Sequence, residues 1–382
     1  MPVASEHVGS GPVAVRRWWR LAAVLAATAV LACTPLIIGS LPVSDASVSA
    51  SALLARIRAS ADIPFSGLAQ SQGNLGLPDL PHTGPTGDLL GGIVRIREWW
   101  AGPARWRVDQ LSDEGELDTY PAVNGSVTWD SEDALVTRVF GAVRVHEPTA
   151  LDLTPPSLGR RLAAGAAGST LTRIGAQRIA GQDAVGVRIT PPVHATTVDH
   201  IDIWATTAGL PVRVSVYGYG AGEPAVTTTF LSVSLQTPAD SVTAFTPTPG
   251  ASFNALRAPD YVASADQGPP LALPSRLGGL PRSSIIGNTG SGVATYGRGY
   301  ALLTVIPLPY DIFGQAERAL QPPVGQMLWH DTGLLESLPL FTVVVGFDPR
   351  QNVPYLLVGT TGRAVMRTVA RALSAEPSGS DG

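Results

Sequence analysis

Residues 198–220, VDHIDIWATTAGLPVRVSVYGYG, contain two runs of alternating apolar and polar residues joined by a Gly-Leu-Pro turn. Ile201 and Ile203 alternate with Asp202, and the valines of the second run alternate with Arg213 in the same way. A period of two residues is typical of a β-strand with one buried face and one face in water. The stretch therefore predicts a hairpin of an antiparallel sheet, and it contains no catalytic motif.

The composition limits the classes of function. The chain has 382 residues, which is long enough for two domains, and its formal net charge of -4 argues against a nucleic-acid partner. It contains no lysine, which excludes a Walker A phosphate-binding loop. Cys33 is the single cysteine, so an intramolecular disulfide and a thiolate metal cluster within one chain are also excluded.

The N-terminal region carries the pattern of a membrane segment. Residues 16–20 read RRWWR, and residues 21–39 contain no charge, which is about the length that spans a bilayer as a helix. Because the arginines precede the apolar segment, the positive-inside rule places residues 1–20 in the cytoplasm. We therefore expect a cell-membrane protein with a single-pass transmembrane anchor at 21–39, a tether at 40–50 and the bulk of the chain extracytoplasmic.

Two other fates of this segment remain open. Small residues at Ala46 and Ala50 fit cleavage of a signal peptide. The residues VLAC, which end at Cys33, loosely resemble the lipidation motif of bacterial lipoproteins. The apolar residues after Cys33 favour instead a cysteine packed in a membrane helix. In each case the working part of the chain faces away from the cytoplasm.

Alternating strands dominate the chain after a short amphipathic helix expected at 51–60. A second helix is expected at 157–168, where two glycines weaken it. Short connections between the strands predict an antiparallel meander. The expected strands lie at 93–100, 104–111, 126–131 and 134–140, in the segments TLTRIGA, AVGVRITP and AVTTTFLSVSLQ, and in the 198–220 hairpin.

A second, smaller unit is expected at 260–375, after a shift in composition near Asp260. It contains strand-like segments (YALLTVIPL, LFTVVVGF and PYLLVGT) and helix-like segments (DIFGQAERAL and AVMRTVARAL). Mixed apolar strands flanked by helices predict a small α+β domain. Residues 376–382 are expected to form a disordered tail.

Signatures of catalysis and metal binding are weak. The six histidines show no zinc-ligand spacing, and no GxSxG nucleophile elbow occurs, so Ser291 is expected in a loop. Asp331 opens the one DTG triplet, but aspartic proteases need a paired aspartate, and the sequence offers no second triplet. We therefore expect no enzyme, no cofactor and no metal site.

The tryptophans point to a core or a cavity. Trp99, Trp100, Trp106, Trp129 and Trp204 all fall on expected strands of the first domain. Tryptophan suits an ordinary core and also the rim of a hydrophobic cavity. A long antiparallel sheet with few helices has to bury its apolar face against something, and a bound acyl chain is one candidate.

Several segments resemble the LolA-like superfamily, which includes LolA, the amino-terminal domain of RseB (MucB), and the LppX and LprG lipid-binding lipoproteins. The resemblance lies in the order of LLARIRAS, FSGLAQSQ, VRIREWWAGPARWRVDQL, VNGSVTWDSEDALVTRVF, the 198–220 hairpin and FTPTPGASF. It implies a mainly β (α+β) fold, an incomplete antiparallel β-barrel closed by helices around a hydrophobic cavity for acyl chains. This fold is expected at 51–255, and the smaller C-terminal domain of RseB matches the layout here.

The resemblance also implies a lid helix and a set of cavity residues. The lid helix would carry Leu53, Leu54 and Ile57. Strand parity, and for Trp129 its aromatic character, selects the cavity residues, and a one-residue register error would turn them outward. The predicted cavity residues are Val94, Ile96, Trp106, Val108, Trp129, Ile201, Ile203, Val212, Val214 and Val216.

The leading hypothesis is a membrane-tethered extracytoplasmic binding protein that buries an acyl chain of a lipid or lipoprotein in this cavity. The alternative is an RseB-like envelope-stress regulator, in which the cavity senses lipid and the C-terminal domain binds a membrane protein partner. LolA diffuses between membranes as a lipoprotein carrier, whereas this chain is expected to keep an anchor at the cytoplasmic membrane. Local handling or sensing of lipid therefore fits better than a shuttle.

Overall fold

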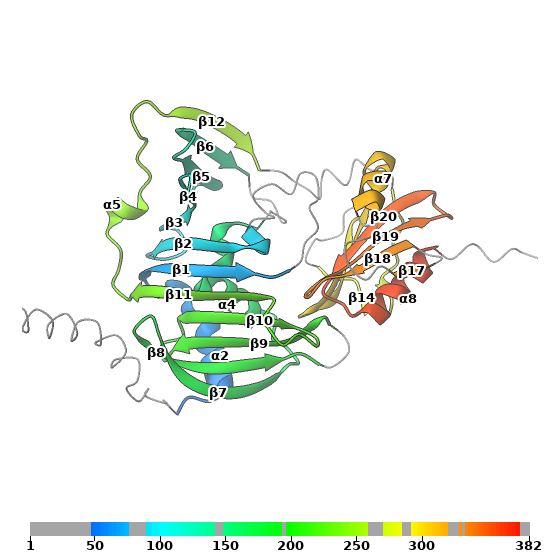
Figure 1. Cartoon of the computed structure of the whole chain (residues 1–382), viewed down its shortest axis with the longest axis horizontal. Helices are drawn as coiled ribbons and strands as arrows, with labels where there is room; N and C mark the ends of the chain where they lie inside the picture. The colour runs from blue at the N-terminus through cyan, green and yellow to red at the C-terminus, as the bar shows by residue number, and fades with distance from the viewer. Residues whose placement is uncertain are drawn as a thin grey trace, which may run out of the picture. The chain divides into compact units, whose positions relative to one another are not determined.

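The computed structural model describes residues 47–75, 89–141, 148–192, 196–258, 270–284, 292–319, 328–330 and 333–374. Within these ranges the chain is mainly β, with one sheet of 12 strands and one of 6 strands (Figure 1). None of the helices in these ranges has the length and apolarity to cross a membrane. The expected anchor at 21–39, Cys33, Ser291, Asp331 and the tail at 376–382 lie outside the described residues.

The large sheet runs in the order β12-β6-β5-β4-β3-β2-β1-β11-β10-β9-β8-β7 (Figure 1). Its strands are β1 (Phe65–Gly73), β2 (Ile93–Trp100), β3 (Trp106–Leu111), β4 (Glu116–Ala122), β5 (Gly125–Asp130), β6 (Leu135–Phe140), β7 (Thr170–Ile179), β8 (Gln182–Thr190), β9 (Val198–Thr206), β10 (Pro211–Gly218), β11 (Val226–Ser234) and β12 (Ser252–Arg257). Two meanders, β2 to β6 and β7 to β11, are joined through β1, which pairs with both β2 and β11. The end strands β7 and β12 do not pair with each other, so the described sheet is not a closed barrel.

One strand departs from the expected antiparallel meander. β12 pairs with β6 in the parallel sense. Residues 235–251, called the strap here, connect β11 to β12 and include the short helix α5 (Asp240–Thr243). Asp240 forms an ion pair with Arg105, and the Phe245 ring packs edge-on against Tyr120. Because the strap carries the chain past the β2–β3 turn before β12 begins, the last strand reaches the sheet edge in the parallel direction.

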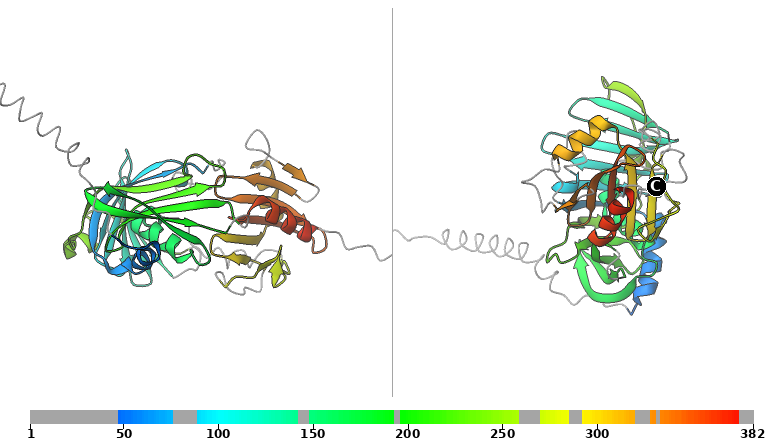
Figure 2. Two further views of the ribbon diagram at one scale, coloured as in Figure 1. Left: turned by 90° about the horizontal axis from the view of Figure 1, so that it is seen from below. Right: turned by 90° about the vertical axis from the view of Figure 1, so that its right-hand side faces the viewer.

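Two helices and two 3₁₀ turns cover one face of the large sheet, called the inner face here. They are α2 (Ala50–Arg58), η1 (Ser60–Asp62), η2 (Ala150–Leu153) and α4 (Pro155–Ala164). Leu53, Leu54 and Ile57 of α2 are buried in one core with Ile203 and Val214 of the sheet. Figure 2 shows the blue helix α2 on the inner side of the curved sheet. The apolar stripe of α2 thus replaces the second sheet of a β-sandwich.

The hairpin formed by β9 and β10 contacts both helices. At its turn, Gly209 has a φ of 103°, and a Cβ there would lie 2.6 Å from the carbonyl carbon of Arg56 in α2. Arg56 Nη1 donates a hydrogen bond to the Thr207 carbonyl at 2.7 Å. On α4, a Cβ at Gly159 would lie 2.7 Å from Pro211 Cγ. The glycine expected to weaken this helix therefore allows close packing on β10.

The smaller sheet has the order β15-β16-β20-β19-β18-β17 and is flanked by helices. Its elements are β15 (Ala294–Arg298), β16 (Ala301–Pro307), α7 (Tyr310–Ala319), β17 (Leu328–His330), β18 (Gly333–Ser337), β19 (Thr342–Asp348), β20 (Val353–Gly359) and α8 (Arg363–Ser374), with the separate pair β13 (Arg276–Leu277) and β14 (Leu280–Pro281). Tyr296, Tyr355, Met366 and Val369 lie in its core. The expected small α+β domain is confirmed.

The turn glycine provides a test of the hairpin's contact with α2. We expect Gly209→Ala to lower the free energy of unfolding by roughly 3 kcal/mol, because alanine is strained at this φ and its Cβ meets the Arg56 backbone. Gly181→Ala is the matched control, since Gly181 has a φ of 79° and open space around it, and we expect a loss of about 1 kcal/mol. Urea denaturation measures both, and equal losses would contradict the proposed contact.

Candidate functional site

The structure brings most of the predicted cavity residues together on the inner face. The residues on this face are Val94, Ile96, Trp106, Val108, Ile201, Ile203, Val214 and Val216. Val212 lies at a bulge of β10 and is fully buried. Leu53, Leu54 and Ile57, the predicted lid residues, pack against this face from α2. In this structure these side chains pack on one another and on α2.

Trp129 differs from the other predicted cavity residues. It pairs with Asp118 of β4, which shares its sheet face with Asp109 and Tyr120. This is the outer face, opposite to α2 and α4. The alternation of residues along a strand shows which of them share a face, but only the register between strands shows which face that is. The β4–β5 register places Trp129 on the outer face.

An acidic residue interrupts the apolar inner face. Glu98 lies on the same face of β2 as Ile96 and Trp100, and none of its surface is exposed. Burial raises the pKa of Glu98 to about 8, against the lowering effects of the Thr154 hydroxyl and the Arg160 guanidinium. A carboxyl group with this pKa is mostly protonated at neutral pH. The sequence alone indicates that Glu98 is unusual, because it stands at a strand position whose alternate neighbours are apolar.

The surroundings of Glu98 leave its oxygens without hydrogen-bond partners of good geometry. Thr154 is close enough to affect the pKa, yet its hydroxyl donates to the Leu151 carbonyl at 3.1 Å. Thr154 is also the N-cap residue of α4, whose first two positions are Pro155 and Pro156. Proline has no N–H, so the start of this helix lacks two donors that another sequence would offer to a carboxylate.

Arg160 of α4 lies near Glu98 and is also incompletely paired. Its guanidinium carbon is 5.1 Å from the ring centroid of Trp100, within the range of a cation–π contact. Nη2 donates to Ser157 Oγ at 3.3 Å, whereas Nη1 is buried and has no partner among the described residues. Burial lowers the pKa of Arg160, although Glu98 opposes this effect.

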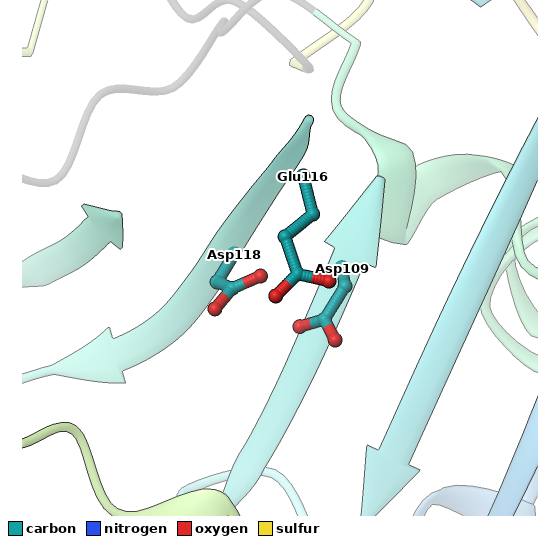
Figure 3. Close-up of side chains that lie close together, drawn as sticks. All are labelled: Asp109, Glu116 and Asp118. Atoms are coloured by element: carbon teal, nitrogen blue, oxygen red, sulfur yellow. The ribbon is translucent and has the colours of Figure 1, made fainter. Parts of the chain in front are cut away.

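A cluster of three carboxylates lies on the outer face. Figure 3 shows Asp109 of β3 with Glu116 and Asp118 of β4, their carboxylates directed toward one another. Oxygens of the three groups lie within 4.8 Å of one another. Arg107 donates to Asp109 Oδ1 at 2.6 Å and to Asp118 Oδ2 at 2.8 Å. The sequence did not point to this cluster, because residues 116–122 were not expected to form a strand.

The arrangement fits an ion-pair network better than a metal site. Burial and the charge of Asp109 raise the pKa of Asp118 to about 7, while burial raises that of Asp109 as well. Two buried carboxyl groups this close share a proton more readily than they carry two charges. Oxygen ligands suit Ca²⁺ or Mg²⁺, but the Arg107 guanidinium already occupies one side of the cluster. We therefore assign no cofactor to these residues.

The comparisons with known proteins concern structure. No protein-family model and no curated protein matches the sequence. The chain is similar to MucB of Pseudomonas aeruginosa in its complex with MucA (17% identity, 84% of this chain and 96% of that chain, TM-score 0.47). It is also similar to the lipoprotein LppX of Mycobacterium tuberculosis (14% identity, 47% and 93%, TM-score 0.26) and to a LolA superfamily protein of Nitrosomonas europaea (10%, 52% and 99%, TM-score 0.20). At these identities and TM-scores the likeness carries no argument about this chain. The structure itself confirms the expected mainly β fold, with an open sheet and helices on one of its faces.

The raised pKa of Glu98 predicts a dependence of stability on pH. Between about pH 4.5 and 8 the folded chain holds a proton on Glu98 that the unfolded chain has released, so stability falls as the pH rises through this range. One such proton corresponds to at most about 1.4 kcal/mol per pH unit. We expect Glu98→Gln to remove this part of the slope in denaturation measured at successive pH values. An unchanged slope would show that Glu98 is already ionised when folded.

Proposed function

We propose that the chain is a binding protein, not an enzyme, whose inner face takes up an acyl chain of a lipid or lipoprotein. The proposal rests on the way in which the inner face is covered. Apolar side chains of β8, β9 and β10 are buried by two short helices and not by a second sheet. If the helices move away, a continuous apolar surface becomes accessible to a ligand.

An acyl chain matches such a surface in chemistry and in energy. Burial of each CH₂ group contributes about 0.8 kcal/mol, so a chain lying along the inner face can offset the loss of the helix contacts. The helices have to shift before the chain enters, because Leu53 and Ile57 fill the space against Ile201 and Ile203. In this proposal α2 is the lid.

We further propose that the chain works at the outer surface of the cytoplasmic membrane. Residues 21–39 would anchor it there, with signal cleavage or lipidation at Cys33 as the remaining alternatives. A tether would keep the inner face close to membrane lipids. The ligand would then be captured locally, without transport between two membranes.

A contact between the domains favours a sensor as the second candidate function. Tyr300, in the turn between β15 and β16, donates from its hydroxyl to the Leu162 carbonyl of α4. Its own carbonyl accepts hydrogen bonds from Thr196 at 2.7 Å and from Thr360 at 2.5 Å. Movement of α4 would therefore disturb the smaller domain, which could pass the signal to a membrane protein partner.

Photo-crosslinking tests the acyl-chain proposal. The full chain is reconstituted in phosphatidylcholine vesicles that contain a fatty acid with a diazirine on its chain. After irradiation, we expect mass spectrometry to find the probe on inner-face residues such as Ile201 and Val214, and not on Arg213 or Ser215 of the outer face. Leu54→Ala should raise the labelling severalfold, because it weakens the hold of α2 on the sheet. Labelling confined to outer-face residues, or none, would contradict the proposal.

The sensor alternative predicts a role for the Tyr300 hydroxyl. We expect Tyr300→Phe to release α4 and to raise the rate of probe labelling severalfold, because one hydrogen bond between the domains is lost. Tyr310→Phe is the matched control, since the Tyr310 hydroxyl donates to Asn352 within the smaller domain. If the two variants label at the same rate as the unmodified chain, the smaller domain does not control α4.

A further inference from the structure

Two buried polar groups without hydrogen-bond partners interact electrostatically at the inner face. Glu98 comes from β2, and Arg160 comes from α4, which covers the sheet. Both Glu98 oxygens and Arg160 Nη1 are buried without hydrogen-bond partners among the described residues. A buried polar group without a hydrogen-bond partner destabilises the fold relative to a paired one. A structural ion pair would relieve this cost, but no oxygen of Glu98 lies within ion-pair distance of Arg160 in the described contacts.

The neighbouring charges do not compensate Arg160. Asp152 of η2 is the nearest acidic residue along the chain, and it pairs with Arg161 and accepts hydrogen bonds from Thr149. Glu98 is mostly protonated at neutral pH because it is fully buried. The described part of the inner face therefore contains a guanidinium with one unmatched nitrogen and no ionised partner.

We propose that Arg160 and Glu98 form a subsite for the acidic headgroup of an acyl lipid, a carboxylate or a phosphate. This inference rests on the proposed function, since it places the polar end of the ligand whose chain lies on the inner face. The guanidinium presents parallel N–H donors that match two oxygens of a carboxylate or phosphate. The protonated Glu98 adds an O–H donor to the same ligand group.

The surrounding residues orient these donors. The Trp100 ring lies against the Arg160 guanidinium, and Trp100 Nε1 is itself fixed by a hydrogen bond to the Ala61 carbonyl at 2.7 Å. Pro155 and Pro156 have no backbone N–H, so the first two positions of α4 offer no donor to a neighbouring group. Val108, which pairs with Glu98, continues the apolar surface beside it. A headgroup at this position has its acyl chain next to the inner face.

Charge selects an acidic headgroup over a neutral or a basic one. A basic headgroup would be repelled by Arg160 and would find no ionised carboxylate there. A neutral alcohol would accept one hydrogen bond and leave the second guanidinium N–H unmatched. An anion both pairs with the buried charge and accepts several donors, and charge-assisted hydrogen bonds are about twice as strong as neutral ones.

The test compares acidic and neutral probes that have the same acyl chains. The full chain in phosphatidylcholine vesicles is irradiated with a diazirine-bearing fatty acid, with the matching fatty alcohol, with phosphatidic acid or with diacylglycerol. The variants are Arg160→Gln and the control Arg161→Gln, whose arginine is largely exposed and pairs with Asp152. Circular dichroism checks that each variant is folded. If Arg160→Gln does not fold, Arg160→Lys replaces it, because lysine keeps the positive charge but lacks the paired N–H donors of the guanidinium.

We expect the unmodified chain to capture at least one acidic probe about tenfold more than its neutral match. Preference for the fatty acid identifies a carboxylate headgroup, and preference for phosphatidic acid identifies a phosphate. Arg160→Gln should lose this preference while still capturing the neutral probes, Arg160→Lys should weaken it, and Arg161→Gln should keep it. Equal capture of acidic and neutral probes, or a preference that survives Arg160→Gln, overturns the subsite but leaves the acyl-chain proposal standing. No capture of any probe refutes both.

Discussion

The packing of α2 and α4 on the inner face is the contact on which the rest of the large domain depends. A single antiparallel sheet with one apolar face has to bury that face against another layer. Here the layer is thin, because the two helices span 9 and 10 residues and the sheet has 12 strands. The β9–β10 hairpin holds both helices, through Gly209 on α2 and Pro211 on α4. The same contact that stabilises the fold is the one that the proposed acyl chain would have to displace.

Sequence alternation predicts the strands whose two faces differ. The 93–100 and 198–220 stretches predict β2 and the β9–β10 hairpin for this reason, and Leu53, Leu54 and Ile57 predict α2. The prediction misses β4, since ELDTYPA has acidic residues and a proline where an ordinary strand has apolar ones. Those acidic residues are tolerated because Arg107 pairs with them on the outer face. Trp129 was assigned to the wrong face for a related reason, since the outer face at β4 and β5 is also partly buried.

Other features depend on contacts between distant segments and could not be predicted from local patterns. The pairing of β1 with β11 and the parallel pairing of β12 with β6 follow from the path of the chain. Glu98 is a different case, because its parity is visible in IVRIREWW, whereas its neighbours Thr154 and Arg160 become evident only in the folded chain. The unusual position of Glu98 could therefore be predicted from the sequence, but its proximity to Thr154 and Arg160 could not.

The position of β1 between β2 and β11 bears on how the chain reaches its folded state. β1 is made first among the strands, yet one of its two edges has no partner until β11 emerges after all the intervening strands. Contacts between such distant segments slow folding, and an exposed strand edge favours aggregation in the meantime. Until β11 has been made, the first meander has its β1 edge unpaired. The two meanders can therefore join into one sheet only after β11 has been made.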